Sequence, residues 1–387
     1  MKKKQVNLYK SLLLLLGILY LGITLSCSNN IQNVRDFLKD THATDEGSKI
    51  HVHTFATEWS SDASGHWHVA TCEHTEEISD YAEHTYGEWN VVQAPKITQE
   101  GKNERTCSGC GDTDSVVLQP APEGFVFVKG TTINGNESWT PESDVFVGER
   151  KLTIPDLIVS DHEVTRGEYK AVMGSDPSTA AAYDKNGNKL EGDAVLNNPV
   201  NYVSWYDALV YCNKLSMKEN LTPCYSIDGS TDPDTWGTVP TSSNSKWNAA
   251  TCNFKANGYR LPTEAEWEWL ARGGEAYTYA GSNTVGDVAW YYENTNGTGT
   301  REVKTKAPNG YGLYDMSGNV WEWCWDWLGS ISSSTAADGA ASGSNRVYRG
   351  GCWLGNANRA SVSYRGYYAG LRDSLLGFRV VCASSID

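Results

Sequence analysis

The chain has 387 residues and a formal net charge of −15, and this acidic balance excludes nucleic acid as the expected partner, because phosphate binding requires a basic surface. Its length allows one large domain with a smaller region beside it. With 15 Trp and 21 Tyr against 7 Phe, its aromatic side chains are mostly amphipathic and suit both a core and a binding face.

The N-terminus has the pattern of an export signal. Four lysines precede an apolar run from Leu12 to about Leu25, which is too short for a spanning helix and ends at a small residue and Cys27. Residues 1–27 resemble a bacterial lipoprotein signal, with Cys27 as the lipidated first mature residue; an ordinary cleaved signal is the alternative. We therefore expect a cell-envelope protein, lipid-anchored in the outer membrane or at the cell surface, with 28–50 as a flexible tether.

The other nine cysteines fall into two groups on either side of residue 120. Export permits disulfides, and a group of six allows three of them without defining their pairing. A group of three is odd and calls for a metal, a free thiol or an intermolecular bond. The first group is Cys72, Cys107 and Cys110, and the second is Cys212, Cys224, Cys252, Cys324, Cys352 and Cys382.

Residues 51–120 form a region rich in cysteine and histidine. The motif CSGCG at 107–111 has the spacing of a zinc knuckle, in which two thiolates from one tight turn bind a single ion. An earlier cysteine with a histidine would complete such a site, whereas a disulfide within the motif, with solvated histidines, is the alternative. We expect a small β-rich, zinc-ribbon-like region with a structural role. The candidate zinc ligands are Cys72, with His74 or His84, and the motif's Cys107 and Cys110.

A short internal echo runs through the same region. The tripeptides HTF at 53–55 and HTY at 84–86 are each followed by a tryptophan, Trp59 and Trp89 respectively. The pattern resembles the small His/Cys-rich repeats of spirochaete and clostridial surface proteins.

Beyond residue 120 the pattern is that of an irregular α+β domain. Three helices are expected among turns and short aromatic strand fragments: Thr165–Met173, Ser204–Lys218 and Thr263–Arg272. The last is the clearest, because Thr263 and Glu266 form a capping box and two glycines at 273–274 end the helix. With so few regular elements, turns, aromatic side chains, disulfides or ions must hold the domain together.

Four tryptophans alternate along 321–327 (WEWCWDW), directly after a Ser-Gly-Asn turn. In an extended strand they share one face, which we expect to pack a large indole core. The turn exposes carbonyls beside Asn319, and together with Glu322 it offers the all-oxygen ligands that suit calcium. The alternative is that Asn319 makes a local hydrogen bond and Glu322 pairs with an arginine. The candidate calcium ligands are Ser317, Asn319, Val320 and Glu322.

Several segments together resemble one family. They are GYRLPTEAEWEWLARGG (258–274), NGYGLYDMSGNVWEWCWDW (309–327), RVYRGG (346–351) and LGFRVV (376–381). The combination is similar to the sulfatase-modifying-factor family, whose fold is the formylglycine-generating-enzyme variant of the C-type lectin fold. The resemblance spans about 123–384 and implies an irregular, C-type lectin-like α+β domain with calcium at the Asn319 turn.

The resemblance does not carry over the family's chemistry. Its catalytic members oxidise a cysteine of a sulfatase peptide with copper held by two cysteines, and Cu(I) favours such soft thiolates. Here Cys352 stands where the family has the serine after Arg-Gly-Gly, Gly355 stands at a catalytic cysteine position, and no cysteine follows before Cys382. We therefore expect no copper site and no catalysis, and His162 is expected to be structural. The disulfides that we expect are Cys324–Cys352 and Cys224–Cys252.

Residues 353–376, between two of these signatures, have neither helix nor strand period but are rich in Tyr, Ser, Gly and Asn, as binding surfaces are. This loop resembles that of the variable proteins of diversity-generating retroelements, in particular the Treponema variable protein. We expect it to be the ligand-binding face, although Trp353 and Tyr364 suit a core equally well. The candidate contact residues are Trp353, Leu354, Gly355, Asn356, Asn358, Tyr367, Tyr368, Leu371, Asp373, Ser374 and Leu375.

The sequence therefore predicts a surface-displayed lipoprotein with a noncatalytic, lectin-type binding domain. Its expected partners are the membrane, through the lipid anchor, and a protein or glycan ligand on a host or neighbouring cell. Calcium and zinc are the expected ions. The alternatives are an active formylglycine-generating oxygenase and a purely structural envelope protein, and the latter would require the tyrosine-rich loop to be buried or disordered.

Overall fold

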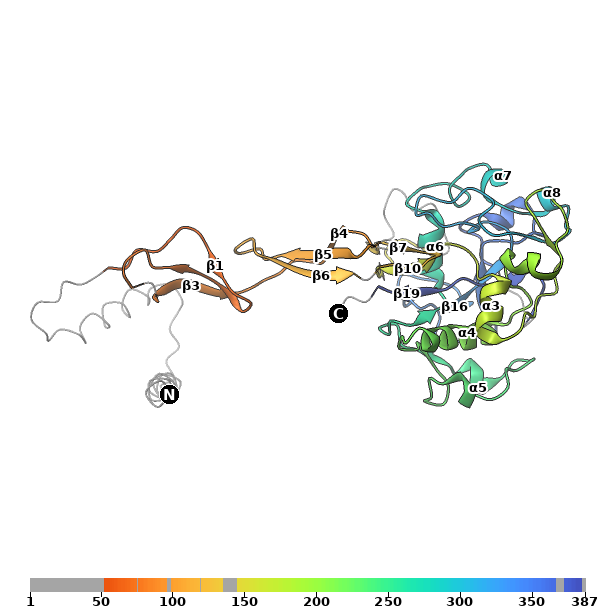
Figure 1. Cartoon of the computed structure of the whole chain (residues 1–387), viewed down its shortest axis with the longest axis horizontal. Helices are drawn as coiled ribbons and strands as arrows, with labels where there is room; N and C mark the ends of the chain where they lie inside the picture. The colour runs from red at the N-terminus through yellow and green to blue at the C-terminus, as the bar shows by residue number, and fades with distance from the viewer. Residues whose placement is uncertain are drawn as a thin grey trace, which may run out of the picture. The chain divides into compact units, whose positions relative to one another are not determined.

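The computed structural model describes residues 52–74, 76–95, 99–118, 120–134, 145–366 and 372–384. The predicted signal, its Cys27 and the tether lie outside these ranges, as do the candidate contact residues Tyr367, Tyr368 and Leu371. The chain divides into two compact units, Met1–Glu83 and His84–Asp387 (Figure 1). Within the described ranges, no helix combines the length and the apolar character needed to cross a bilayer.

The region rich in cysteine and histidine contains two three-stranded antiparallel sheets instead of one continuous fold. The first unit holds the sheet β1 (Ser60–Ser61), β2 (Gly65–Val69) and β3 (Ile78–Glu83). The second unit holds the sheet β4 (Asn90–Gln93), β5 (Gly101–Thr106) and β6 (Thr113–Leu118). Composition placed a boundary near residue 120, but the structural division falls between Glu83 and His84. The change in composition marks the end of the Cys/His pattern and not the end of a packing unit.

The larger domain comprises residues 123–384, and a four-stranded antiparallel sheet contains its first and last strands. Its order is β14 (Tyr259–Arg260), β19 (Val381–Ala383), β10 (Leu157–Ser160) and β7 (Phe125–Val128). All four residues of β10 are buried, so this strand is the centre of the sheet. Three two-stranded ladders complete the strands outside the tryptophan segment: β8 (Thr131–Ile133) with β9 (Leu152–Ile154), β11 (Ala182–Tyr183) with β15 (Thr300–Arg301), and β12 (Tyr225–Ser226) with β13 (Thr251–Cys252).

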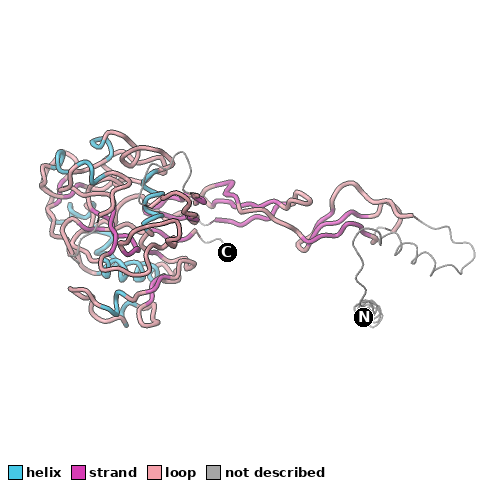
Figure 2. The backbone as a smooth tube through the Cα atoms, turned by 180° about the vertical axis from the view of Figure 1, so that it is seen from behind, coloured by secondary structure: helices cyan, strands magenta, loops and turns pink. Residues whose placement is uncertain are grey.

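The three predicted helices are confirmed, and each begins at a capping box. They are α3 (Arg166–Met173) capped by Thr165, α4 (Trp205–Lys218) capped by Ser204, and α6 (Glu264–Arg272) capped by Thr263. Short helical turns occur at α5 (Ser245–Asn248), α7 (Val285–Val288), α8 (Tyr292–Thr295), η1 (Gly192–Asn197), η2 (Pro233–Thr235) and η3 (Ala357–Ala360). Loops and turns make up most of the larger domain, as its irregular pattern predicted (Figure 2).

The tryptophan segment forms β16 (Trp321–Trp327), the central strand of a sheet with β17 (Arg346–Arg349) on one side and β18 (Leu376–Gly377) on the other. The predicted indole core is confirmed, because Trp321, Trp323 and Trp325 are buried in one hydrophobic cluster. The fourth tryptophan departs from it: after an irregularity in the ladder, Trp327 is half-buried and its ring lies 3.5 Å from the Arg346 guanidinium.

Buried ion pairs fix α6 against this sheet. The Arg349 guanidinium lies 3.0 Å from the Glu264 carboxylate and 2.6 Å from that of Glu268, and Glu268 also pairs with Arg272. None of these four side chains is more than 1 % exposed. Ionic contacts between side chains are thus one of the means by which a domain with few regular elements is held together.

Candidate functional site

A pocket of about 460 Å³ lies against the predicted binding loop. Its aromatic wall comes from Trp321, whose ring packs edge-on to Tyr348 at a centroid distance of 5.0 Å and tilted against Tyr364 at 5.8 Å. The lining residues are Trp321, Tyr348, Arg359, Tyr364, Arg365, Gly366, Asp373, Leu375 and Leu376. A concave site with aromatic walls and a few charged groups is the usual form of a small-ligand or side-chain pocket.

Contacts within the protein hold the wall of the pocket in place without a ligand. Gly366 and Tyr348 exchange two backbone hydrogen bonds, at 2.9 and 3.2 Å, which tie the loop to β17. A Cβ atom at position 366 would lie 2.2 Å from the Tyr348 ring, so only glycine allows this approach. Arg365 donates to both carboxylate oxygens of Glu264, at 2.7 and 2.8 Å. Such preorganisation lowers the entropy cost of binding.

Arg359 carries the positive charge that the pocket leaves available. Its side chain is exposed, and among the described residues its guanidinium has no hydrogen-bond or ion-pair partner. Arg365, in contrast, is already paired with Glu264, and the Asp373 carboxylate accepts a hydrogen bond from the Leu375 amide at 3.0 Å. An acidic group on a ligand would find a charge-assisted donor at Arg359.

The predicted contact residues divide between this pocket, the surface and the core. Asp373 and Leu375 line the pocket. Trp353 is buried among core residues, which is the alternative that its sequence context left open, and its indole donates to the Ser374 carbonyl at 3.5 Å. The remaining described candidates are Leu354, Asn356 and Asn358, which are exposed, Ser374, which is half-buried, and Gly355, which is buried.

Glu322, the carboxylate of the predicted calcium site, is bonded to an arginine. Its oxygens accept two hydrogen bonds from Arg379, both at 2.7 Å, and one from the Trp267 indole at 2.7 Å. Both Glu322 and Arg379 are fully buried. A guanidinium that engages both carboxylate oxygens does not fit a calcium ligand, because the ion would face a second positive charge at contact distance.

The other candidate calcium ligands are also bonded to protein groups. The Asn319 side chain accepts from the Arg301 amide at 3.0 Å and donates to Glu163 at 2.8 Å. The Val320 amide donates to the same carboxylate at 2.9 Å, and the Ser317 hydroxyl donates to a backbone carbonyl at 2.7 Å. The arginine-paired alternative therefore describes Glu322, and the Asn319 side chain is engaged within the fold.

The cysteines of the larger domain have free thiols in the structure, so the two expected disulfides are absent. Cys324 and Cys352 belong to different hydrophobic clusters, because β16 directs Cys324 away from its tryptophan face. The Cys224 thiol donates to a backbone carbonyl at 3.1 Å instead of bonding to Cys252. Burial raises the pKa of Cys352 to about 11 and that of Cys324 well above its usual range, which keeps both as thiols at neutral pH and disfavours metal binding.

His162 lies between two carboxylates. Nδ1 is 2.5 Å from Asp161 and Nε2 is 3.3 Å from Glu168, so both ring nitrogens are engaged within the fold. Burial on its own would lower the pKa of His162, but the hydrogen bonds with Asp161 and Glu168 outweigh it and raise the pKa to about 9.

The stability of the protein is expected to fall between pH 6.5 and pH 9 because of His162. Its pKa is raised in the folded state, so the stabilisation is complete below the unfolded value of 6.5 and is lost as the pH rises through about 9. The loss is on the order of 1–3 kcal/mol. Urea denaturation across this range should show the slope in the wild type and a flatter profile in His162→Gln. An unchanged slope in the variant would assign the titration to another group.

The five candidate zinc ligands divide between two groups of potential ligand atoms. Cys72 and His74 lie together in the first unit, and sequence reasoning missed the third side chain there, His53. The second unit brings its own three candidates together: the potential ligand atoms of His84, Cys107 and Cys110 lie within 4.8 Å of one another. The echo of HTF and HTY is the signal that would have identified His53, because it gives His53 and His84 equivalent positions.

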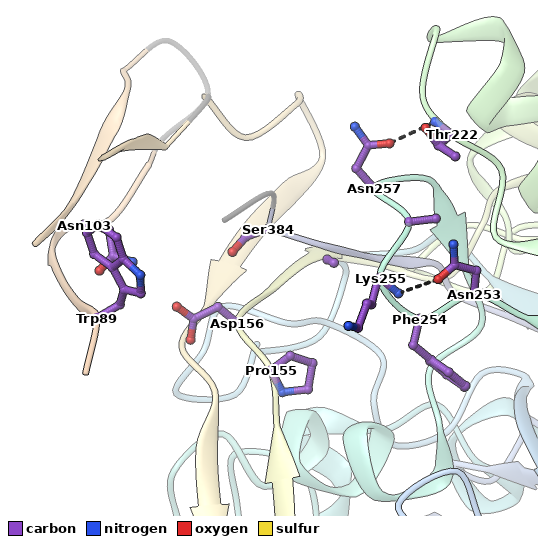
Figure 3. Close-up of a pocket in the computed structure, with 12 residues that line it drawn as sticks. Trp89, Asn103, Pro155, Asp156, Thr222, Asn253, Phe254, Lys255, Asn257 and Ser384 are labelled. Atoms are coloured by element: carbon purple, nitrogen blue, oxygen red, sulfur yellow. Dashed lines mark hydrogen bonds between the residues drawn. The ribbon is translucent and has the colours of Figure 1, made fainter. Parts of the chain in front are cut away.

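A second pocket, of about 660 Å³, has a different lining (Figure 3). One wall is the loop 253–257, which is fixed by a hydrogen bond of 2.9 Å from the Thr222 amide to the Asn257 side chain. No residue of 353–376 lines it. The smaller pocket is therefore the one that matches the predicted binding face.

Three residues important to the smaller pocket escaped the sequence reasoning: Arg359, Arg365 and Tyr348. Arg359 and Arg365 lie inside the predicted loop, but arginine is common on solvated surfaces and carries no periodic signal there. Tyr348 belongs to β17, and only the pairing of this strand with β16 brings it beside the loop.

The chain is similar to known proteins along most of the larger domain. The family model described as a sulfatase-modifying factor enzyme 1-like domain matches residues 113–384. The chaperone protein LppX of Paenibacillus barcinonensis is 38% identical over 282 residues, which are 68% of this chain and 88% of that protein. The formylglycine-generating enzyme of Streptomyces coelicolor is 39% identical over 165 residues, 36% of this chain and 51% of the enzyme.

Solved structures show the same relationship. Treponema denticola variable protein 1 has 33% sequence identity and a TM-score of 0.56, and the match covers 77% of this chain and 99% of that one. The structure of CarF has 26% identity and a TM-score of 0.53, covering 69% of this chain and 100% of that one.

Proposed function

The chain belongs to the sulfatase-modifying factor enzyme 1-like family and has its irregular C-type lectin-like fold, and from this premise we propose that it is a noncatalytic, ligand-binding member of the family. The proposal places it in the cell envelope, displayed at the surface and held through a lipid on Cys27. Its ligand occupies the pocket beside residues 353–376.

The pocket is the observation that carries the binding role. It combines the aromatic surfaces of Trp321, Tyr348 and Tyr364 with the Arg359 guanidinium, which has no partner among the residues that the structure describes. Tyrosine and tryptophan offer large contact areas at small entropy cost, and arginine is enriched where binding energy is concentrated. A protein or glycan ligand with an acidic group next to an apolar or planar surface suits this arrangement best.

The state of the cysteines supports the absence of catalysis. The family's chemistry needs two thiolates near one copper ion, whereas Gly355 occupies one of the positions concerned. Cys352, at the family's serine position, is the nearest thiol in the sequence, and it is buried and protonated at neutral pH. An active oxygenase is the competing function, and a purely structural envelope protein is the third.

Binding through the pocket is tested by screening the full chain against arrayed glycans and peptides and measuring the affinity of the selected ligands. We expect Arg359→Ala and Tyr364→Ala each to weaken binding at least about tenfold, because each removes a pocket contact worth about 1.4 kcal/mol or more. Tyr277→Ala is the matched control, since Tyr277 is exposed elsewhere on the domain. Equal affinities in all variants would place the ligand outside the pocket.

The same preparation separates this function from the oxygenase. Cu(I)-loaded protein is incubated with a sulfatase-derived cysteine peptide, and formylglycine is measured by mass spectrometry. We expect no product and no change in Cu(I) affinity on Cys352→Ser. If the wild type forms formylglycine and Cys352→Ser does not, the protein is an active oxygenase and the proposed function is wrong.

A further inference from the structure

We propose that the region rich in cysteine and histidine binds two zinc ions at separate sites, one in each unit. The first site consists of His53, Cys72 and His74, and the second consists of His84, Cys107 and Cys110. This inference is independent of the ligand-binding face and replaces the single zinc site that the sequence suggested.

The separations between ligand atoms are those of tetrahedral zinc. Bonds of about 2.3 Å to sulfur and about 2.0–2.1 Å to nitrogen place a sulfur and a nitrogen ligand about 3.6 Å apart at the tetrahedral angle. In the first site the Cys72 sulfur is 3.3 Å from His53 Nδ1 and 3.7 Å from His74 Nδ1. In the second site the Cys110 sulfur is 3.6 Å from His84 Nδ1. In the first site, three protein ligands leave the fourth position of the ion to a further donor.

The second site also has the surroundings of a metal ligand. The Nε2 atom of His84 lies 3.8 Å from the Asp112 carboxylate, while Nδ1 faces Cys110. A carboxylate on the far nitrogen orients a ligating imidazole and increases its basicity. Cys107 and Cys110 are not joined by a disulfide, and the Gly111 amide donates to the Cys107 carbonyl at 2.9 Å to close the tight turn of a knuckle.

The two sites are built in the same way, which argues that the geometry is not accidental. The threonine after each first histidine accepts the same pair of hydrogen bonds from the turn that carries the cysteines. Thr54 O accepts from the Thr71 amide at 2.7 Å and from its hydroxyl at 3.0 Å. Thr85 O accepts from the Ser108 amide at 3.0 Å and from its hydroxyl at 3.2 Å. The sequence echo is therefore a repeated metal-binding arrangement.

The sheets need such a ligand because they have little apolar core. Among the described residues of 52–83, only Gly65, His66 and Ala70 are buried, and β3 has no buried residue. Domains this small are commonly stabilised by metals or disulfides, because apolar burial alone does not offset the entropy of folding. Zinc bound by deprotonated ligands would contribute its binding free energy directly to folding.

The test is zinc stoichiometry of the purified full chain after reconstitution and removal of loosely bound metal. We expect two equivalents in the wild type, one in Cys72→Ser, one in Cys110→Ser and none in the double variant. His68→Ala is the matched control and should retain two, because His68 interacts with the Glu58 carbonyl and stacks on Trp59. One equivalent or none in the wild type, or two in Cys72→Ser, would overturn the proposal.

Alkylation of the wild type removes the risk that a variant misfolds. Zinc should protect Cys72, Cys107 and Cys110 from alkylation. Removal of the zinc by a chelator, without a reductant, should make all three reactive. If Cys107 and Cys110 become reactive only after a reductant is added, they form a disulfide and the second site is wrong. If Cys72 is equally reactive with and without zinc, the first site is wrong.

Discussion

Glu322→Gln is expected to lower the free energy of unfolding by about 3–5 kcal/mol, because it leaves the guanidinium of Arg379 buried without its counter-charge. The two side chains are fully buried and share two hydrogen bonds of 2.7 Å, and the Trp267 indole donates to the same carboxylate. Urea denaturation monitored by tryptophan fluorescence measures the loss directly. The expected change is a lower midpoint with little change in slope.

Glu191→Gln is the control for the removal of one carboxylate charge. Glu191 pairs with Lys189 at 3.3 Å on the surface, and an exposed pair contributes less than about 1 kcal/mol. Repeating both measurements with calcium and with EDTA distinguishes the ion pair from a calcium site. The ion pair predicts the same loss in both buffers, whereas a calcium ligand predicts that EDTA destabilises the wild type and removes the difference.

Gly318→Ala is expected to cost roughly 2–5 kcal/mol, the sum of backbone strain and a steric clash. Gly318 has φ +87°, and a Cβ atom there would lie 2.3 Å from the carbonyl oxygen of Trp290 and 2.7 Å from its amide nitrogen. The backbone cannot yield easily, because the Asn319 amide donates to the same Trp290 carbonyl at 2.8 Å. The Asn319 carbonyl accepts from the Trp353 amide at 2.7 Å, so displacement of this turn should also weaken ligand binding.

Gly187→Ala separates the two contributions. Gly187 has φ +84°, close to that of Gly318, but a Cβ atom at position 187 would meet nothing within 4 Å. We expect it to cost only the strain, on the order of 1 kcal/mol. Equal melting temperatures for the two variants would mean that the Trp290 contact adjusts freely and that the turn is not a rigid support.

The parts of the fold that were predictable depend on residues close together in the chain. A capping box needs only the four residues from Thr263 to Glu266, and it located the start of α6 correctly. The alternation in 321–327 likewise reports a strand face, because the period of two is local. The family segments add the global fold, since their combination depends on many separated positions.

The contacts that the sequence could not indicate depend on partners far away in the chain. Glu322 is explained by Arg379, 57 residues later, and Asn319 by Glu163, 156 residues earlier. The sequence alone does not show which distant residues come together in the fold. At that level, a carboxylate that binds calcium and a carboxylate that accepts from arginine have the same sequence pattern. The zinc candidates could not be divided into two groups from the sequence for the same reason, because the grouping depends on which histidines fold beside each turn.

The three strands of the tryptophan sheet have a consequence for how this domain can evolve. Glu322 is in register with Arg349 of β17 and with Gly377 of β18, so the chain leaves and re-enters the sheet on the two sides of a single strand. Exchange of the residues between these two strands leaves the pairing of β16 with β17 and β18 intact as long as Gly366 keeps its two hydrogen bonds with Tyr348, and changes in loop length cost little closure entropy. New specificities can therefore arise by mutation in this segment without a search for a new fold. The same property makes the domain a suitable scaffold for randomised libraries selected against chosen targets.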